Sequence, residues 1–309
     1  MKCKYCNSKS EIYVDYARMS LCKNCFLNFI EDKVKRTILK YQMIREKDKV
    51  VVAVSGGKDS SSLLALLKKL AVKQKIPNFE MIALHINLGI GEYSENCEKS
   101  VKKLCKLLNV ELKIFDLKKE LGFTIEDVEK VRFRRNVCAA CGMVKRYVLN
   151  LFATRVNATK IATGHHLDDM LAVLWDAYLQ ADFQTIAKVE PVLATHSSLV
   201  ARIKPLVELC EYETKAYAEF SNLPIASSQC KFGKGARLKR RKKLLDSIEK
   251  MKPSFKHTFW KTHLKRFLPH IKKIAEFPEI RKCKICGMPT SLEVCGVCKL
   301  RNLIQQSKQ

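Results

Sequence analysis

Acidic residues are scarce in this chain, and hydrophobic runs long enough to span a membrane are absent. Thirty-one Asp and Glu residues stand against fifty-eight Lys and Arg residues, which gives a net charge of +27 over 309 residues. No apolar segment reaches the length of a transmembrane helix, and the first residues lack the apolar core of a secretory signal. The shortage of acid favours a polyanionic partner, above all nucleic acid, and we expect a cytoplasmic protein with no membrane contact.

The spacing of a Walker A loop is also missing, although a glycine-containing turn follows an apolar run. Residues 50–54 predict a buried strand, the motif SGGKDS occupies residues 55–60, and the apolar run that follows predicts a helix opening at Ser60. Two adjacent glycines let backbone approach a bound anion, and N–H groups at the start of a helix point toward it. The motif therefore predicts a phosphate-binding loop without γ-phosphate transfer, and an ordinary tight turn is the alternative.

Strand and helix patterns alternate through the middle of the chain. Further strands are predicted at residues 80–87, 110–115 and 160–163, and helices at 94–108 and 165–179. This alternation predicts an α/β fold with a doubly wound parallel sheet. Ligands of such sheets bind at the carboxyl ends of the strands, which is where SGGKDS falls.

Fourteen cysteines in a chain without a secretory signal predict metal binding rather than disulfides. Two Cys-x2-Cys pairs lie at each end of the sequence and predict two structural zinc sites, with buried or redox thiols as the alternative. The expected ligands are Cys3, Cys6, Cys22 and Cys25 at one end and Cys283, Cys286, Cys295 and Cys298 at the other. Gly287 and Gly296 each directly follow a cysteine of a pair, where a positive φ is often needed.

A third Cys-x2-Cys pair, Cys138 and Cys141, has no second pair nearby. Its expected partner is Cys230, eighty-nine residues later and beside a basic run. Three thiolates among positive charges could hold an iron–sulfur centre with one iron left without a protein ligand. A redox dithiol of Cys138 and Cys141, or an attacking thiol at Cys230, are alternatives. The other cysteines, 97, 105 and 210, are expected to be buried thiols.

The last third of the chain is strongly basic. Residues 231–243 hold eight basic and no acidic residues, and residues 251–273 hold seven more, interleaved with aromatic residues. We expect RNA contact there, with the aromatic side chains in the core and the histidines of this segment at the surface; a solvated helix face is the alternative. These composition changes predict four segments: 1–30, 31–225, 226–278 and 279–309.

Taken together and in this order, the motifs resemble those of the TtuA/NcsA group of tRNA 2-thiouridine synthetases, in the wider TtcA family of PP-loop ATP pyrophosphatases. The shared motifs are SGGKDS, a Cys-x2-Cys-Gly-x2-Lys-Arg block at 138–146, Gly-His-His-Leu-Asp-Asp at 164–169, a late single cysteine and flanking zinc quartets. The resemblance covers essentially the whole chain. One position departs from the family pattern, because His166 stands where the familiar motif has Asn.

The resemblance implies a role for each matching residue. It makes Cys138, Cys141 and Cys230 the ligands of a [4Fe–4S] cluster whose open iron binds the sulfide to be transferred. Lys145 would lie near the reacting centre, and Asp59 and Asp169 at the phosphates of ATP and its Mg²⁺. The implied nucleotide-binding residues are Ala53, Ser55, Gly56, Gly57, Ser60, His85 and Gly164. The implied cofactors are the cluster, two Zn²⁺ ions, ATP and Mg²⁺.

The implied reaction is adenylation of the C2 oxygen of a tRNA uridine, at position 34 or 54, and its replacement by sulfur. The sulfur donor would be a thiocarboxylated ubiquitin-like protein, a persulfide carrier or sulfide, and a homodimer is expected. Thiolation of a tRNA cytidine, as in the TtcA branch, and a non-catalytic tRNA-binding subunit are the alternatives. Another PP-loop RNA modifier, such as a lysidine synthetase, would not need the three central cysteines.

Overall fold

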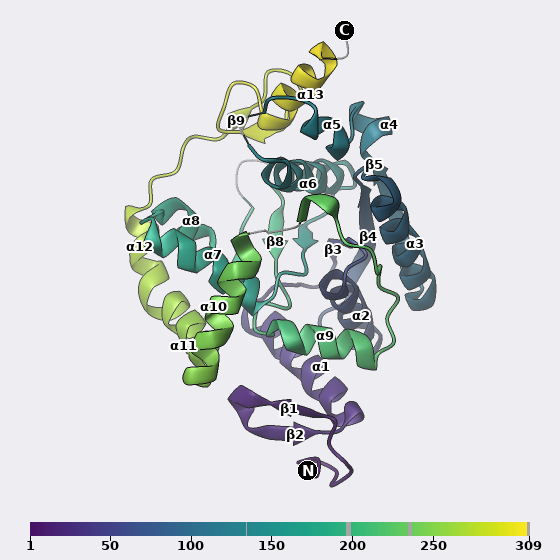
Figure 1. The fold of residues 1–309 in the computed structure, drawn as a ribbon, viewed down its shortest axis with the longest axis vertical. Coiled ribbons are helices and arrows are strands. Elements are labelled where there is room, and N and C mark those ends of the chain that lie inside the picture. Colours follow the sequence, from purple (N-terminus) through teal and green to yellow (C-terminus); the bar gives the residue numbers. More distant parts are fainter. Residues whose placement is uncertain (134, 196–198, 234–236, 308–309) are drawn as a thin grey trace.

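The computed structural model describes residues 1–133, 135–195, 199–233 and 237–307, and a six-stranded sheet forms its centre (Figure 1). The strand order is β5-β4-β3-β6-β8-β7, and all neighbours are parallel except the edge strand β7, which is antiparallel to β8. The strands are β3 (Asp48–Ala53), β4 (Phe79–Asn87), β5 (Glu111–Asp116), β6 (Lys160–Ala162), β7 (Val192–Leu193) and β8 (Ala201–Ile203). The predicted α/β fold is therefore confirmed; β7 and β8 were not predicted.

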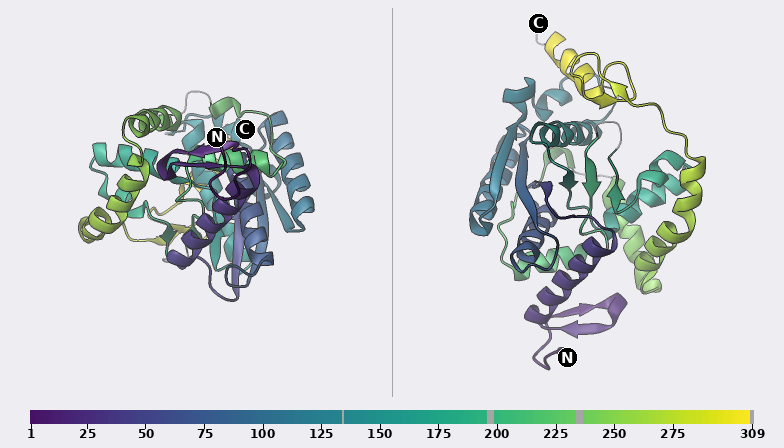
Figure 2. Two further views of the ribbon diagram at one scale, coloured as in Figure 1. Left: turned by 90° about the horizontal axis from the view of Figure 1, so that it is seen from below. Right: turned by 180° about the vertical axis from the view of Figure 1, so that it is seen from behind.

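Helices cover both faces of this sheet (Figure 2). Side chains alternate along β3, so Val50 and Val52 join one core while Val51 joins the other. The first core includes residues of α1 (Lys23–Lys40), α2 (Lys58–Val72), α3 (Gly91–Leu108), α7 (Leu167–Leu179) and α9 (Glu211–Phe220). The second includes residues of α4 (Leu117–Leu121), α5 (Ile125–Glu129), α6 (Val137–Arg155) and α13 (Gly296–Gln306). A strand buried on both faces explains the unbroken apolar run at 50–54.

The strand order changes direction between β3 and β6. The chain passes from β3 to β4 and β5 on one side, then returns across the sheet through α6 to place β6 on the other side of β3. The loops that leave β3 and β6 therefore diverge at the carboxyl edge of the sheet. In open α/β sheets this switch point is where ligands bind.

A helical segment follows the sheet and packs against α7 and the short helix α8 (Phe183–Lys188). It consists of the 3-10 turn η2 (Lys231–Gly233), α10 (Arg237–Met251), α11 (Phe255–Thr262), the π-helical turn η3 (His263–Phe267) and α12 (Leu268–Ile274). None of the helices in the described part of the chain has the length and apolar character needed to cross a bilayer.

Two expectations for this segment are wrong in part. Trp260 is buried as expected, but the Phe267 ring is 48% exposed and lies edge-on to Tyr178. His263 is fully buried rather than at the surface, because its ring nitrogens contact the Val189 carbonyl oxygen and the Tyr178 hydroxyl at 2.9 Å each. Satisfied hydrogen bonds on both nitrogens make this burial inexpensive.

The two cysteine-rich ends form small separate units at opposite ends of the long axis (Figure 1). The first is the hairpin of β1 (Ile12–Val14) and β2 (Met19–Leu21), joined by η1 (Asp15–Ala17) and leading into α1. The second is the hairpin of β9 (Arg281–Lys282) and β10 (Pro289–Thr290), followed by α13. We call them the N-terminal and C-terminal modules.

Candidate active site

A cavity of about 480 Å³ opens at the switch point, between the loops that leave β3 and β6. Its walls also include residues of β4, α3, α6 and β8. The sequence-predicted residues that line it are Ala53, Ser55, Asp59, Ser60, His85, Lys145 and Gly164. Most of the residues predicted to bind a nucleotide thus meet in one cavity.

Two glycines allow the close backbone packing at the mouth of this cavity. Gly56 has a φ of +87°, and a Cβ atom there would lie 3.0 Å from the backbone of Cys97. A Cβ atom on Gly164 would lie 3.0 Å from the backbone of Asp59 and Ser60. The loop after β6 therefore rests on the first residues of α2, where any side chain at Gly164 would separate them.

Hydroxyl groups hold the SGGKDS loop against the start of α2. Ser60 Oγ accepts a hydrogen bond from the Ser55 N–H at 3.1 Å and donates one to the Gly57 carbonyl oxygen at 3.1 Å. Gly57 is the residue that precedes α2. The fixed loop and the free N–H groups at the start of α2 suit a bound phosphate.

His85 presents an unpaired hydrogen-bonding atom in the same cavity. Its Nδ1 lies 2.9 Å from the Val54 carbonyl oxygen, so Nδ1 carries the hydrogen and Nε2 is an acceptor. Nε2 is buried and has no hydrogen-bond partner among the described residues. Burial lowers the pKa of His85, which keeps the ring neutral. A neutral acceptor of this kind fits the amino group of an adenine base.

Three carboxylates gather beside the cavity at the starts of three helices: Asp59 of α2, Asp169 of α7 and Glu211 of α9. Lys58 Nζ lies 2.8 Å from Asp59 Oδ1 and 3.2 Å from Glu211 Oε1. Lys242 Nζ lies 2.6 Å from Asp169 Oδ1 and 3.0 Å from Glu211 Oε2. Burial opposes the charges on Asp169 and Lys242, but their neighbours lower the pKa of the carboxyl and raise that of the ammonium. We call these five residues the acidic group; its oxygen atoms suit a hard cation such as Mg²⁺.

His166, the departure from the family motif, is fully buried within the acidic group rather than in the cavity. Its Nε2 lies 3.4 Å from Asp169 Oδ2 and 3.3 Å from Lys242 Nζ. Asp168 is buried beside it: Asp168 Oδ2 accepts the Glu211 N–H at 2.7 Å, and its other oxygen pairs with Lys256. These side chains form the floor under the acidic group.

The opposite wall of the cavity is cationic. Lys145, Arg146, Arg202 and Lys204 all line it. Among the described residues, Lys145, Arg146 and Arg202 make no ion pair with a carboxylate. Lys204 is 8% exposed and donates to the Glu190 carbonyl oxygen at 2.6 Å, and burial lowers its pKa to about 8. Unneutralised cations in a partly buried wall predict an anionic ligand.

The three central cysteines lie at the edge of this wall. Cys138 and Cys141 are in the first turns of α6, and Cys138 Sγ donates to the Phe232 carbonyl oxygen at 2.7 Å, which brings the segment of Cys230 against the helix. Burial raises the pKa of Cys141, as do Cys230 and Cys138, while Lys145 acts in the opposite direction. The structure thus brings Cys230, eighty-nine residues beyond Cys141, to Cys138, Cys141 and Lys145 of α6.

Cys97 belongs to the same neighbourhood. It is 4% exposed, as expected for a buried thiol, but it also lines the cavity. Burial raises its pKa, while Tyr93 and Lys145 lower it and Cys230 raises it. The sequence offered no motif at this position that would have indicated its place.

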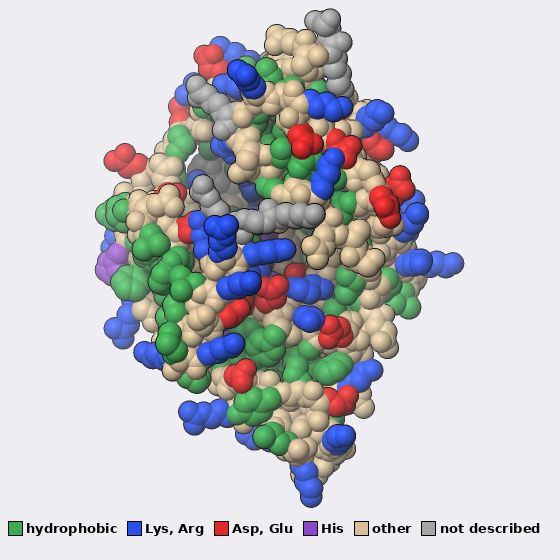
Figure 3. All heavy atoms as spheres, viewed as in Figure 1, with side chains coloured by type: hydrophobic (Ala, Val, Ile, Leu, Met, Phe, Trp, Pro, Cys, Tyr) green, Lys and Arg blue, Asp and Glu red, His purple; other side chains and the backbone are tan. Residues whose placement is uncertain are grey.

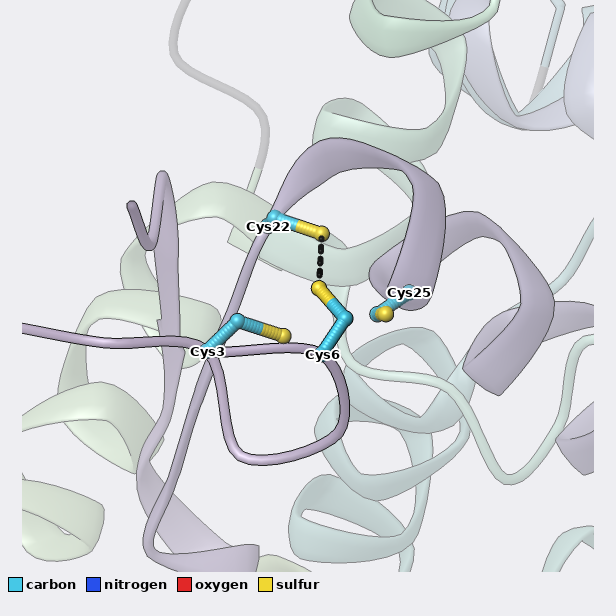
Figure 4. Close-up of side chains that lie close together, drawn as sticks. All are labelled: Cys3, Cys6, Cys22 and Cys25. Carbon is cyan, nitrogen blue, oxygen red and sulfur yellow. Dashed lines mark hydrogen bonds between the residues drawn. The ribbon is translucent and has the colours of Figure 1, made fainter. Parts of the chain in front are cut away.

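The terminal cysteines form two tight quartets, the first shown in Figure 4. All four sulfur atoms of each quartet lie within 4.8 Å of one another. Cys6 and Cys22 are 3.5 Å apart, and Cys286 and Cys295 are 3.7 Å apart. Zinc–sulfur bonds of about 2.3 Å in a tetrahedron require sulfur atoms about 3.8 Å apart, so each quartet fits one tetrahedral metal ion.

The central thiols do not form such a quartet. Within the described residues, the groups in which all ligand atoms lie within 4.8 Å are the two terminal quartets. Cysteines of an iron–sulfur cluster bind different irons and so lie farther apart than ligands of one ion. The wider set of Cys138, Cys141 and Cys230 fits a cluster better than a single metal ion.

Of the two glycines in the C-terminal module, only one has the predicted conformation. Gly287 has a φ of +71°, whereas Gly296 is the first residue of α13 and does not have a positive φ. Gly296 is needed for another reason: a Cβ atom there would lie 2.4 Å from Met143 Sδ of α6. The C-terminal module is therefore packed directly on the helix that carries Cys138 and Cys141.

Lys and Arg side chains gather over α10 on the face that Figure 3 shows, with Asp and Glu side chains between them. Within the basic run, residues 234–236 and the side chain of Arg237 lie outside the description. Lys239, Arg240 and Lys243 are exposed, whereas Lys231 pairs with Glu126 at 2.9 Å. Arg241 pairs with Asp176 of α7, and Lys242 enters the acidic group. Among the described side chains of the basic run, Lys239, Arg240 and Lys243 are therefore the exposed cations without a carboxylate partner.

Sequence reasoning missed Glu211, Thr214 and Lys242. Thr214 Oγ1 donates to Asp59 Oδ1 at 2.6 Å, and Glu211 holds both lysines of the acidic group. Glu211 is the first residue of α9, a helix that the sequence analysis did not predict, so its place beside Asp59 and Asp169 could not be foreseen. Lys242 gave no signal either, because it was one of eight cations in a run.

Comparison with known proteins agrees with this geometry. A family described as a PP-loop domain matches residues 30–226. The chain is 38% identical over 306 residues to the tRNA-5-methyluridine(54) 2-sulfurtransferase of Pyrococcus horikoshii, covering 98% of this chain and 94% of the relative. It is 35% identical to the enzyme of the same name from Thermotoga maritima, covering 100% of this chain and 98% of the relative.

A solved structure has the same fold over the whole chain. The U34-tRNA thiolase NcsA from Methanococcus maripaludis with its [4Fe–4S] cluster superposes with a TM-score of 0.80 at 29% identity, covering 98% of this chain and 96% of that one. The fold and site define a PP-loop enzyme. Within that class, the chain belongs to the TtuA/NcsA-type family of tRNA 2-thiolation sulfurtransferases.

Proposed function

We propose that this protein adenylates the C2 oxygen of a tRNA uridine with ATP and replaces that oxygen with sulfur, giving 2-thiouridine. One observation carries the proposal: Lys145 lines a cavity that also holds the SGGKDS loop, and the same lysine lies beside the three central thiols. A protein that only binds a nucleotide has no need of clustered thiols, and a protein that only carries thiols has no need of a phosphate-binding loop. Their common location suits activation by ATP followed by sulfur transfer.

The chain's own residues account for the first step. The uracil C2 oxygen attacks the α-phosphorus of ATP, the new O–P bond forms, and the bond to pyrophosphate breaks. The SGGKDS loop and the start of α2 would hold the leaving phosphates, and His85 would accept a hydrogen bond from adenine. Lys145 and Arg202 face the cavity and would neutralise negative charge that develops there. Mg²⁺ on Asp59 and Asp169 would supply further charge neutralisation.

The second step exchanges oxygen for sulfur. Sulfur attacks C2, and the C2–O bond breaks so that the oxygen departs with AMP. A [4Fe–4S] cluster on Cys138, Cys141 and Cys230, when bound, would supply an iron open to sulfur from outside the protein. Lys145 beside Cys141 would favour the thiolate form of these ligands. Sulfide, a persulfide carrier and a thiocarboxylated ubiquitin-like protein remain candidate donors.

For the target nucleotide we favour uridine 54. The relatives at 38% and 35% identity carry position 54 in their names, whereas the thiolase at 29% identity acts on U34. The exposed cations of α10 would bind the tRNA backbone without reading its sequence. We also propose that each terminal quartet binds zinc and that the protein is a homodimer. The four-segment organisation predicted from the sequence is part of the same proposal.

The test is an anaerobic reaction of the metal-loaded protein with unmodified tRNA, ATP and sulfide, mapped by nucleoside and oligonucleotide mass spectrometry. We expect one sulfur atom on uridine 54, none with Cys230→Ala, and unchanged sulfur insertion with Cys105→Ala. Cys105 is the matched control because it is buried, 3% exposed, and does not line the cavity. Sulfur on uridine 34 would show that the target is position 34 rather than 54. Sulfur on a cytidine would show that the substrate is not a uridine. Full activity of Cys230→Ala would show that Cys230 is not a cluster ligand.

A further inference from the structure

Lys242 differs from its neighbours on α10 in where it lies. Lys239, Arg240 and Lys243 are exposed, but the side chain of Lys242 is only 16% exposed. It points into the acidic group, with Nζ 2.6 Å from Asp169 and 3.0 Å from Glu211. One cation of a helix otherwise suited to RNA has thus been placed beside the nucleotide cavity.

The acidic group connects Lys242 to the phosphate-binding loop. Glu211 contacts Lys242 through one carboxylate oxygen and Lys58, of the SGGKDS motif, through the other at 3.2 Å. Lys58 in turn contacts Asp59, which lines the cavity. Two lysines from distant parts of the chain therefore share one carboxylate at the place where the outer phosphates of ATP would lie.

The helix does not need Lys242 to stay in place. Leu245 of α10 is fully buried, and Arg241 pairs with Asp176 of α7. Asp246 shares Lys256 with Asp168, which fastens the next turn of the helix to the start of α7. A purely structural role for Lys242 would duplicate these contacts.

We propose that Lys242 is a nucleotide-site residue that binds the β- and γ-phosphates of ATP. In the nucleotide-free protein its ammonium neutralises Asp169 and Glu211. When the magnesium complex of ATP enters, the metal ion takes the carboxylate oxygens, and the ammonium, still held nearby by α10, contacts phosphate oxygens. This role rests on the proposed function, because it assumes that ATP binds over the SGGKDS loop.

Electrostatics act in the same direction as the contact. Asp59, Asp169 and Glu211 face Lys58 and Lys242, so removal of Lys242 would leave an excess of negative charge beside a highly charged anion. A hydrogen bond to a charged group typically changes a binding constant by about tenfold or more. Loss of Lys242 should therefore weaken binding of any ligand that carries the outer phosphates and spare one that lacks them.

The experiment compares Lys242→Gln with Lys243→Gln in the full-length, metal-loaded protein. Binding of ATP, pyrophosphate and AMP is measured by titration calorimetry with Mg²⁺ and without tRNA or a sulfur source. We expect Lys242→Gln to weaken ATP and pyrophosphate at least about tenfold and to leave AMP unchanged. Lys243→Gln, the same chemical change one residue away, should leave all three unchanged and weaken only tRNA.

Several outcomes would overturn the assignment. Wild-type affinity of Lys242→Gln for ATP would make the lysine a mere counter-charge, and an equal loss of AMP would indicate general damage to the site. Lys242→Arg keeps the charge and should recover most of the ATP affinity; it carries the test if Lys242→Gln does not fold. A wild-type protein that binds no ATP would overturn the proposed function as well. If the wild-type protein thiolates tRNA normally and Lys242→Gln binds ATP with wild-type affinity, only this inference is overturned.

Discussion

The ends of this molecule and its centre use the same residue types in opposite ways. At each end, four thiols converge within 4.8 Å, a set that fits one tetrahedral metal ion. In the centre, three thiols lie beside Lys145, one of the cavity-lining cations that have no carboxylate partner among the described residues. The ends are built to be stable once their metal is bound, whereas the centre is left incomplete and is completed only by its substrates.

The same contrast appears between the acidic group beside the cavity and the cations that line the cavity. The carboxylates of the acidic group are neutralised by Lys58 and Lys242, so this group is stable without a ligand. Among the lining cations, Lys204 is buried, and burial lowers its pKa. Buried cations that lack a carboxylate partner reduce the stability of the folded protein, and such losses of stability are common at functional sites.

The largest effect should come from breaking the two quartets one at a time. Cys3→Ala and Cys283→Ala should each remove one bound metal ion and lower the free energy of unfolding by on the order of 4 kcal/mol. Only Cys283→Ala should also lower the thiolation rate, by about tenfold or more, because its module packs against α6 and small displacements of catalytic groups are costly.

The measurements are metal content by mass spectrometry, thermal unfolding, and thiolation at a temperature where both variants are folded. Equal losses of rate in the two variants would show that the C-terminal module has no special relation to the centre. An unchanged metal content in either variant would remove that quartet from the list of metal sites.

A smaller effect, opposite in sign, is expected at Lys204. Its pKa falls from 10.5 to about 8 on folding, so the unfolded chain binds more protons between these pH values. The penalty for burying the charge is complete below pH 8 and disappears as the pH rises toward 10.5. Lys204→Met should therefore stabilise the protein by roughly 2 kcal/mol at pH 7 and by much less at pH 10.5. Chemical denaturation at both pH values measures this difference.

That variant should also lose activity, since the cavity would lose one of its cations. If Lys204→Met is more stable and still thiolates at the full rate, the buried charge of Lys204 is not needed to bind the anionic ligand. Lys40→Met is a suitable control, because Lys40 lies far from the cavity and its exposed ion pair with Glu208 contributes little.

The smallest effect concerns the contact between the C-terminal module and α6. A methyl group on Gly296 would meet the flexible end of Met143, so Gly296→Ala should cost about 1 kcal/mol and reduce the rate a few-fold. The double variant Gly296→Ala with Met143→Ala should recover the rate, because the space is restored. Additive losses in that cycle would show that the contact does not position α6.

The sequence was sufficient for the parts that local patterns determine. The apolar run at 50–54 and the motif after it predicted β3, the loop and α2, and paired cysteines predicted both quartets. What it could not reveal depends on contacts between distant residues: Lys242 meets His166 across 76 positions, and β7 pairs with β8 over two residues. His263 was misplaced because its partners on α7 and α8 are visible only in the folded chain.

The contact of Gly296 with Met143 also has a consequence for the order in which the protein is assembled. The helix that carries Cys138 and Cys141 leaves the ribosome well before the cysteines of the C-terminal module, and a metal ion on that quartet would shape the module before it docks. Until the module docks, the side of α6 that it covers is exposed. With the proposed metal site, maturation would be sequential, and metal binding at the tail would precede the final placement of α6.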